Sequence, residues 1–213
     1  MRYGMVIDLK KCIGCYACQT ACKAEHLTPP GIFWTRIIKR EHGKFPNVGL
    51  LNLPLICMQC DEPLCVDACP TGATYKRPED GIVIVDPSKC MGCRACIAAC
   101  PYGARYHAKG LKEYFPGQGL TAFELLGLQW HATQGVVEKC DFCLTTGRLQ
   151  EGREPACVEV CMTRARYFGD LDDPDSEVSR LINLKGGFQL NPELATEPCV
   201  FYLPDYRGTS LQE

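Results

Sequence analysis

Residues 12–22 read Cys-Ile-Gly-Cys-Tyr-Ala-Cys-Gln-Thr-Ala-Cys, and residues 90–100 read Cys-Met-Gly-Cys-Arg-Ala-Cys-Ile-Ala-Ala-Cys. In both runs three cysteines follow one another at steps of three, and a fourth comes four positions after the third. A loop with this spacing can present three thiolates to three iron corners of an iron-sulfur cubane. The fourth cysteine then points away and ligates a different cluster.

Two stretched variants complete the pattern. The second group is Cys57-x2-Cys60-x4-Cys65-x3-Cys69, and the fourth is Cys140-x2-Cys143-x13-Cys157-x3-Cys161. Sixteen of the 17 cysteines therefore belong to four groups, and only Cys199 stands outside them. A proline follows the second and third groups and turns the chain out of the site, because it cannot continue a helix. Met162 takes that place after the fourth group.

Three chemistries compete for these cysteines. Disulfides suit small exported scaffolds, and an odd total of 17 fits them poorly. Structural zinc takes cysteines as two Cys-x2-Cys pairs, an arrangement that the fourth group alone would satisfy. The first and third groups favour iron-sulfur clusters, since three cysteines at steps of three match a cubane. Because all sixteen positions are cysteine, the simplest inventory is four [4Fe-4S] clusters.

The composition is that of a globular chain without strong charge. The 213 residues include 23 Lys and Arg against 25 Asp and Glu, which argues against binding nucleic acid or acidic lipid by bulk charge. The longest apolar run, Leu50 to Met58, is interrupted by Asn52 and Pro54 and is far shorter than the ~18 residues of a membrane helix. The first eight residues read as a strand without a signal peptide or twin arginine, so we expect the mature chain to start near Met1.

The sequence repeats itself around the cysteine groups. Residues 7–15, Ile-Asp-Leu-Lys-Lys-Cys-Ile-Gly-Cys, are matched by residues 85–93, Val-Asp-Pro-Ser-Lys-Cys-Met-Gly-Cys. Each of these runs predicts a strand end that leads into a cluster loop. A second repeat covers residues 69–75, 100–106 and 161–167. It predicts that a strand begins after each of these three groups.

Local patterns predict a hairpin and several short helices. Residues 74–76 and 82–85 flank Arg-Pro-Glu-Asp-Gly, which is typical of a turn between two antiparallel strands. Alanine-rich stretches predict helices over residues 18–23, 65–69 and 96–100. Asp175 or Ser176 is expected to cap a helix that runs to Leu184. Together these elements predict an α+β fold.

On these motifs, the chain resembles the four-cluster [4Fe-4S] electron-transfer subunits of the DMSO reductase family of molybdopterin enzymes. The resemblance reaches to about Arg207. Besides the cysteine spacing it rests on residues 5–8 (Met-Val-Ile-Asp), 57–66 (Cys-Met-Gln-Cys-Asp-Glu-Pro-Leu-Cys-Val), 71–73 (Thr-Gly-Ala) and 169–174 (Gly-Asp-Leu-Asp-Asp-Pro). It implies two interleaved bacterial-type ferredoxin modules with short helices, β-hairpins and loop insertions.

The resemblance also implies how the sixteen cysteines are shared. The implied sets are cluster 1 on Cys12, Cys15, Cys18 and Cys161; cluster 2 on Cys22, Cys140, Cys143 and Cys157; cluster 3 on Cys69, Cys90, Cys93 and Cys96; and cluster 4 on Cys57, Cys60, Cys65 and Cys100. Module A comprises residues 1–56 and 140–213, and module B comprises residues 57–106. Cluster 1 is expected to lie nearest the molybdenum subunit and cluster 4 nearest the outer electron partner.

Residues 107–139 form an insertion rich in glycine and aromatic residues. One interpretation is a surface loop that closes over its own module. The other is a loop that docks a partner subunit through Phe123, Leu125, Leu126 and Trp130, because exposed apolar patches mark interfaces.

The rest of the chain shows no substrate chemistry. It contains no nucleophile elbow, phosphate loop or dinucleotide glycine motif. The histidines pair with no carboxylate at catalytic spacing, and we interpret them as solvated or structural; they are His26, His42, His107 and His131. Cys199 lies in an alternating segment, which favours a buried apolar role over a reactive one.

The function that follows is electron transfer rather than catalysis. The leading hypothesis is a subunit that relays single electrons between a molybdenum or tungsten molybdopterin subunit and a quinone-linked membrane subunit or soluble carrier. A free-standing polyferredoxin and a zinc scaffold are the alternatives. The resemblance favours export together with a partner that bears the twin-arginine signal, with the cytoplasm as the alternative location.

Overall fold

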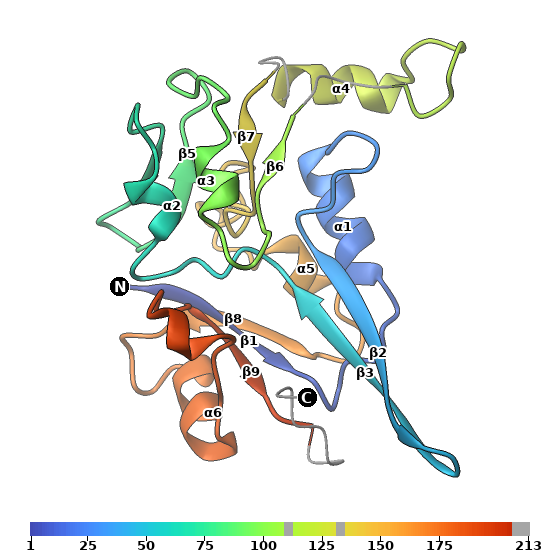
Figure 1. Cartoon of the computed structure of the whole chain (residues 1–213), viewed down its shortest axis with the longest axis vertical. Coiled ribbons are helices and arrows are strands. Elements are labelled where there is room, and N and C mark those ends of the chain that lie inside the picture. Colours follow the sequence, from blue (N-terminus) through green and yellow to red (C-terminus); the bar gives the residue numbers. More distant parts are fainter. Residues whose placement is uncertain (109–112, 131–134, 206–213) are drawn as a thin grey trace.

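The structure, a computed structural model, describes residues 1–108, 113–130 and 135–205. Within these residues short strands and helices surround the cysteine loops (Figure 1). The strands are β1 (Tyr3–Asp8), β2 (Arg36–Lys44), β3 (Asn47–Leu55), β4 (Thr74–Lys76), β5 (Val83–Val85), β6 (Tyr106–His107), β7 (Val137–Glu138), β8 (Arg166–Asp170) and β9 (Val200–Leu203). The helices are α1 (Ala17–His26), α2 (Leu64–Asp67), α3 (Ala95–Ala98), α4 (Ala122–Trp130), α5 (Ala156–Glu159), α6 (Glu177–Lys185) and the 3-10 helix η1 (Pro192–Leu194). This mixed content agrees with the predicted α+β class.

The N-terminal strand is the centre of the largest sheet. In it β1 pairs antiparallel with β8 and parallel with β9. Met5, Val6 and Ile7 are 0 % exposed, because both faces of the strand are covered. Met5 and Ile7 belong to the main core, whereas Val6 packs with Val178 of α6 on the other face. The strand expected before the first cysteine group is thereby confirmed.

Helix α6 begins where the sequence predicts. The Ser176 Oγ accepts a hydrogen bond of 3.2 Å from the Ser179 N–H, which satisfies one of the free donors of the first turn. The helix ends at Lys185, and Gly186 follows in the left-handed conformation that commonly terminates helices. Val178 packs from this helix onto the sheet.

Two of the short ladders follow the tails of the cysteine groups. Strands β4 and β5 form the predicted antiparallel hairpin, with Thr74 opposite Val85. Strands β6 and β7 pair Tyr106 with Glu138 and His107 with Val137. The second ladder brings the two ends of the 107–139 insertion together. As expected, a strand follows each of the three repeated tails: β4 comes after the second group, β6 after the third and β8 after the fourth.

A long hairpin of β2 and β3 was not predicted. It extends from the body of the protein, and Phe45 at its tip is 92 % exposed (Figure 1). The apolar run that begins at Leu50 supplies most of β3. The base of the hairpin is attached to the main sheet, because the Tyr202 hydroxyl donates a hydrogen bond of 2.8 Å to the Pro54 carbonyl oxygen.

The four cysteine-bearing helices pack in two pairs. Helix α1 packs against α5, and α2 packs against α3. The first pair therefore joins the first and fourth cysteine groups, and the second pair joins the second and third groups. The expected helices over 18–23, 65–69 and 96–100 are present, although α2 and α3 end before Cys69 and Cys100.

Hydrogen bonds from buried polar side chains connect the loop of the second cysteine group to the loop of the fourth. Gln59 is buried, and its Nε2 donates to the Cys140 carbonyl oxygen at 2.7 Å, while its Oε1 accepts from the Val83 N–H at 2.8 Å. Lys139, also buried, donates from Nζ to the Cys140 carbonyl at 2.8 Å and to the Val83 carbonyl. One amide and one ammonium therefore link three segments of the chain.

Replacing Gln59 by leucine should destabilise the folded protein. The variant removes the side-chain acceptor of the Val83 N–H, whereas the Cys140 carbonyl keeps its hydrogen bond from Lys139. An unsatisfied buried group costs about 1–3 kcal/mol, and we expect a loss of this size in the free energy of unfolding. Denaturant titration of the holoprotein, followed by circular dichroism, measures it. Gln150→Leu at an exposed position is the control, and equal stability of the two variants would contradict the role of this joint.

Candidate metal centre

The loops of the first and third cysteine groups have the same backbone conformation. Gly14 and Gly92 have φ values of 67° and 70°, and Tyr16 and Arg94 both have 64°. These left-handed residues turn the chain so that the cysteines can face a common centre. Glycine is also required sterically, because a Cβ on Gly92 would lie 2.1 Å from the Gly135 carbonyl oxygen.

The second and fourth groups use the same turn without glycine. The residue before the second cysteine is Gln59, with φ 47°, in one group and Phe142, with φ 57°, in the other. Helices α2 and α5 start directly after Pro63 and Pro155, two positions before the third cysteine of each group. The two stretched groups therefore have the same local structure, namely a left-handed residue before the second cysteine and a short helix that starts after a proline.

The tails of the last three groups also repeat in three dimensions. The third residue after the last cysteine is left-handed in each tail, with φ 65° at Gly72, 56° at Gly103 and 47° at Arg164. A strand begins shortly after each of them. The turn therefore separates each cysteine loop from a strand of the scaffold.

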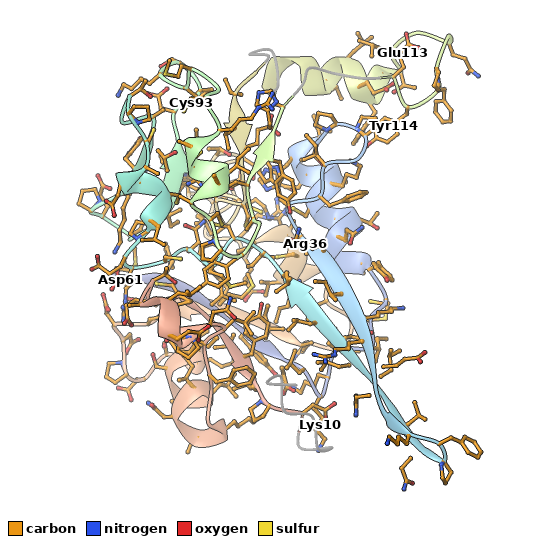
Figure 2. The ribbon with its side chains drawn as sticks, viewed as in Figure 1. Lys10, Arg36, Asp61, Cys93, Glu113 and Tyr114 are labelled. Carbon is orange, nitrogen blue, oxygen red and sulfur yellow. The ribbon has the colours of Figure 1, made fainter. Side chains whose placement is uncertain are left out.

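No disulfide joins any of the 17 cysteines, all of which lie in described residues. Eight are buried, namely Cys18, Cys22, Cys57, Cys96, Cys140, Cys143, Cys157 and Cys199. Seven are half-buried, namely Cys12, Cys60, Cys65, Cys69, Cys90, Cys100 and Cys161. Cys15 and Cys93 are exposed and occupy equivalent places in the first and third groups; Figure 2 labels Cys93 on its loop near the surface.

Cysteines of the first and fourth groups come together. Burial and the nearby thiolate of Cys157 raise the pKa of Cys22 to about 12. Burial, followed by the thiolates of Cys22 and Cys157, raises the pKa of Cys140 well above its ordinary value. The pKa of Cys143 is raised by burial and by Cys157, while the Ala156 N–H opposes the rise. Cys22, Cys140, Cys143 and Cys157 are thus electrostatic neighbours.

Cysteines of the second and third groups also lie close together. Burial raises the pKa of Cys60 to about 12, and the thiolates of Cys57, Cys65 and Cys100 add to the effect. Burial likewise raises the pKa of Cys65, against the opposing charge of Arg105. Cys100 lies 35 or more positions from the other three in the sequence, so the fold brings them together.

The first group also meets the end of the fourth. The pKa of Cys12 is raised by burial and by the thiolates of Cys18 and Cys161, while the Gly14 N–H and Arg166 oppose the rise. The Ala165 N–H donates to the Cys161 Sγ at 3.2 Å. A backbone donor and a cation therefore accompany this set of sulfur atoms.

For Cys69 of the second group and Cys90 of the third, the structure shows hydrogen bonds to the individual sulfur atoms rather than a contact between them. The N–H of Thr74 donates to the Cys69 Sγ at 3.3 Å, and the N–H of Val137 donates to the Cys90 Sγ at 3.5 Å. Although burial opposes it, hydrogen bonds from Thr74 and Thr71 lower the pKa of Cys69 to about 7. Donors of this kind stabilise a ligating thiolate.

One histidine and two arginines that touch cysteine sulfur were not identified from the sequence. The His26 Nε2 lies 3.3 Å from the Cys143 Sγ, and its ring lies beside that of Trp34. Arg105 donates to Cys65 at 2.9 Å, and Arg166 donates to Cys18 at 3.5 Å. His26 was expected to be solvated or structural and proves to be buried against a cysteine. No local signal reveals these contacts, because each partner is at least 40 residues away.

The donor sets fit [4Fe-4S] clusters. Each consists of thiols, and backbone or side-chain N–H groups point at sulfur, as in iron-sulfur sites. Across the residues that the structure describes, no group of three or more His, Cys, Asp or Glu side chains is arranged to hold a single metal ion. A cubane, by contrast, keeps its four sulfur ligands apart on separate iron atoms.

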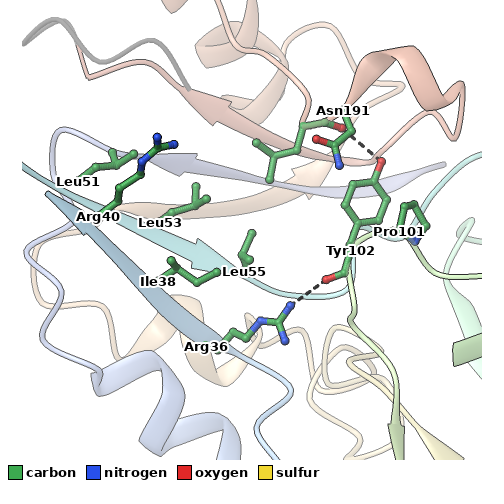
Figure 3. A pocket seen from close by; sticks show the side chains of 10 residues that line it. Arg36, Ile38, Arg40, Leu51, Leu53, Leu55, Pro101, Tyr102 and Asn191 are labelled. Atoms are coloured by element: carbon green, nitrogen blue, oxygen red, sulfur yellow. Dashed lines mark hydrogen bonds between the residues drawn. The ribbon is translucent and has the colours of Figure 1, made fainter. Parts of the chain in front are cut away.

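A groove of about 430 Å³ opens close to Cys60 and Cys100 (Figure 3). Its lining consists of Arg36, Ile38, Arg40, Leu51, Leu53, Leu55, Pro101, Tyr102, Leu190 and Asn191. Tyr102 lies two positions after Cys100, and its hydroxyl hydrogen-bonds Thr196 at 2.6 Å. Thr196 in turn hydrogen-bonds the Cys60 thiol. Through Tyr102 and Thr196 the groove is connected to Cys60, and the β2–β3 hairpin forms one of its sides.

Comparison with known proteins identifies the family. A family model described as a 4Fe-4S dicluster domain matches residues 48–115 and 126–171, and one described as a 4Fe-4S binding domain matches residues 3–24. The sulfite dehydrogenase B subunit of Allochromatium vinosum is 42 % identical over 94 % of this chain and 82 % of its own length. The selenate reductase B subunit of Mesobacillus selenatarsenatis is 44 % identical over 93 % and 70 %. The arsenate respiratory reductase iron-sulfur subunit ArrB of a Shewanella species is 38 % identical over 97 % of each chain.

The chain belongs to the iron-sulfur electron-transfer subunits of molybdopterin oxidoreductases. Its cofactors are [4Fe-4S] clusters, and its cysteine content fits four of them. The family resemblance stated from the sequence is confirmed, as are the electron-transfer function and the ferredoxin-type α+β domains. None of the helices in the described segments is long and apolar enough to cross a bilayer.

Cys199 differs from the other cysteines in its surroundings. It lies just before β9 and is 2 % exposed, so the expected burial is confirmed. Its neighbours are not purely apolar, because Arg2, Asp61 and Lys76 act on its charge. Burial, with Arg2 opposing, raises the pKa of Cys199 to about 11. A thiol with this pKa is only about one part in a thousand ionised at pH 8.

Replacing Cys199 by alanine should leave the iron content unchanged. In the native holoprotein, alkylation by iodoacetamide at pH 8 should spare Cys199, because the thiol is buried and protonated, and modification should require unfolding. Iron analysis and peptide mapping after alkylation measure the two outcomes. A loss of about four irons in Cys199→Ala would make this residue a ligand and contradict its exclusion from the four groups.

Proposed function

We propose that this chain relays single electrons through four [4Fe-4S] clusters between a molybdopterin catalytic subunit, which holds molybdenum or tungsten, and an outer electron partner. The proposed ligands are Cys12, Cys15, Cys18 and Cys161 for cluster 1; Cys22, Cys140, Cys143 and Cys157 for cluster 2; Cys69, Cys90, Cys93 and Cys96 for cluster 3; and Cys57, Cys60, Cys65 and Cys100 for cluster 4. The outer partner is a quinone-linked membrane subunit or a soluble carrier. Clusters 1 and 4 lie at the two ends of the relay.

One observation supports the ligand sets of clusters 1, 2 and 4, whereas the set of cluster 3 rests on the family resemblance. Cysteines that are far apart in the sequence interact electrostatically in combinations that cross the four groups. Cys22 interacts with cysteines of the fourth group, and Cys60 interacts with Cys100 of the third. If each cysteine group held its own cluster with all four of its cysteines, cysteines of different groups would not need to lie close together. They support clusters shared between groups, as in two-cluster ferredoxins.

The same contacts support two interleaved modules. We propose that residues 1–56 and 140–213 form module A and that residues 57–106 form module B. The packing of α1 on α5 and of α2 on α3 supports this division, because each pair carries cysteines of one module. In the sequence, module B is then inserted between the two parts of module A, and residues 107–139 connect module B to the second part of module A.

We infer that the substrate is chosen by the catalytic partner. Sulfite, selenate and arsenate appear in the names of three relatives that resemble this chain to a similar degree. Such different oxyanions share one kind of iron-sulfur subunit. For location, we propose export together with a partner that bears a twin-arginine signal. Membership in a family that includes a respiratory reductase subunit supports this, and the cytoplasm is the alternative.

Replacing Cys18 by serine should impair cluster 1 and leave module B intact. The parent holoprotein should contain about sixteen irons and as many acid-labile sulfides, since each of the four clusters holds four. In the variant we expect altered EPR signals from module A and loss of electron delivery to the catalytic subunit. Iron and sulfide analysis, EPR and turnover with an artificial electron donor measure these changes. Zinc without sulfide in the parent, or unchanged EPR and turnover in the variant, would overturn the proposal.

Besides the pairing of its two ends in β6 and β7, the insertion has a further attachment at Tyr114, and its helix α4 presents apolar side chains. The Tyr114 hydroxyl donates to the Thr28 carbonyl at 3.2 Å, next to the end of α1 (Figure 2). Helix α4 starts with a capping box in which the Thr121 N–H donates to Glu124 at 2.6 Å. Phe123, Leu125 and Leu126 of this helix are 44–57 % exposed. Residues 109–112 and 131–134 of the insertion lie outside the described residues, as does the side chain of Trp130.

We propose that Phe123, Leu125 and Leu126 dock a partner subunit. The double variant Phe123→Asp/Leu126→Asp should reduce co-purification of the complex at least tenfold, because two charges would have to be buried at the interface. The iron content of the isolated chain should not change, since both side chains are exposed. Leu184→Asp, on the exposed side of α6, is the matched control. Normal co-purification of the double variant would leave the insertion as a loop that only covers its own module.

A further inference from the structure

Two buried arginines occupy equivalent places in the repeated tails. Arg105 comes five positions after Cys100, and Arg166 comes five positions after Cys161. Both residues are 4 % exposed. A guanidinium in such a position is costly unless its charge and its N–H donors are satisfied. Its partners therefore indicate why it is there.

The partners of Arg105 are cysteines of both sets in module B. Its Nη2 donates to the Cys65 Sγ at 2.9 Å, and its Nη1 donates to the Thr74 Oγ1 at 3.1 Å. Thr74 is the residue at the same place in the tail of the second group, so the two equivalent positions of the module meet. The thiolates of Cys57 and Cys96 also act on the arginine. Cys65 and Cys57 belong to the proposed cluster 4, and Cys96 to cluster 3.

Arg166 has the corresponding surroundings in module A. Its Nη2 donates to the Cys18 Sγ at 3.5 Å, and its Nη1 lies 3.7 Å from the Met5 Sδ. The thiolates of Cys157 and Cys161 act on its charge. Cys18 and Cys161 belong to the proposed cluster 1, and Cys157 to cluster 2. Each arginine thus interacts with ligands of both proposed clusters of its module. Each also donates a hydrogen bond to a ligand of the outer cluster, which is the cluster at one end of the relay: cluster 4 for Arg105 and cluster 1 for Arg166.

A third buried arginine shows that this choice of partner is specific. Arg148 is buried to a similar degree, but it pairs with the carboxylates of Glu25 and Glu159. Its charge is thereby compensated locally. The charges of Arg105 and Arg166 are compensated by sulfur ligands instead.

We propose that Arg105 and Arg166 are positioning residues that raise the reduction potentials of cluster 4 and cluster 1, the two ends of the relay. Reduction adds negative charge to a cluster, and a fixed cation that donates to a ligating sulfur stabilises the reduced form more than the oxidised form. Burial keeps this interaction from being screened by water. Cluster 3 should respond in the same direction but less, because Arg105 acts on its ligand Cys96 only through its charge. Cluster 2 should shift together with cluster 1, because Arg166 hydrogen-bonds the Cys157 thiolate as well as that of Cys18. This inference rests on the proposed ligand sets.

The test is an EPR-monitored redox titration of the holoprotein with Arg105→Met, Arg166→Met and the matching lysine variants. Methionine removes the charge at similar volume, and lysine keeps the charge but lacks the planar fork. We expect each methionine variant to lower the equilibrium constant for one-electron reduction of its outer cluster about tenfold or more, where tenfold corresponds to 59 mV. The lysine variants should fall between methionine and the parent. Arg148→Met, which removes a carboxylate-paired charge, should not shift the potentials.

Iron content separates the outcomes. A parent with about sixteen irons and four [4Fe-4S] signals supports the proposed function whatever the arginines do. An unshifted potential in a fully loaded Arg105→Met or Arg166→Met variant would overturn the role of that arginine alone. An equal shift in Arg148→Met would overturn it as well, because the effect would then reflect net charge. Should a methionine variant lose iron, Arg105→Gln or Arg166→Gln decides in the same titration, because glutamine removes the charge but keeps N–H donors. A loaded glutamine variant with the parent's potential counts against the proposal.

Discussion

Sulfur has to be held at fixed positions in the interior of the chain, and the rest of the structure depends on this constraint. Cys18, Cys22, Cys57, Cys140 and Cys157 are themselves members of the main hydrophobic cluster, beside residues such as Met5 and Tyr202. Outside the β2–β3 hairpin the described strands have six residues or fewer, and the helices α2, α3 and α5 have four each. Cluster assembly therefore contributes directly to folding, because the ligands are brought together only in the folded chain. The elements are short because they connect cysteine loops.

The same constraint explains where the buried charges lie. Sixteen thiolates and four cluster cores of roughly +2 add about −8 to a formal net charge of −2. Of the buried cations, Arg105 and Arg166 lie beside sulfur and Lys139 lies beside the Cys140 carbonyl, whereas Arg148 pairs with carboxylates. In most protein interiors a lone guanidinium would be strongly unfavourable. Here cysteine sulfur atoms supply the compensating charge, so on the proposed ligand sets the structural and redox roles fall on the same side chains.

Local signals in the sequence were sufficient wherever the determining residues are close together. The spacing of each cysteine group, the turn before β5 and the cap at Ser176 all act over a few positions, and the predicted hairpin and helix agree with the structure. The β2–β3 hairpin was missed because Pro54 and the charges of β2 obscure its strand pattern. His26 was missed for a different reason, since its partner Cys143 is 117 positions away. Contacts of that range are set by the packing of the modules, which no single segment encodes.

The residue before the second cysteine shows how one repeated turn acquires different uses. All four groups need a left-handed residue there. Where neighbouring chain leaves no room for a side chain, as at Gly14 and Gly92, the residue is glycine. Where there is room, the side chain is directed into the body of the protein: Gln59 bonds to the loop of the fourth group, and Phe142 packs on Phe168 of β8. The strain of a non-glycine residue in this conformation, of order 1–3 kcal/mol, is offset by these buried contacts. The turn that positions a cluster ligand thus also joins the segments on either side of the relay, and the geometry of electron transfer and the integrity of the fold depend on the same few residues.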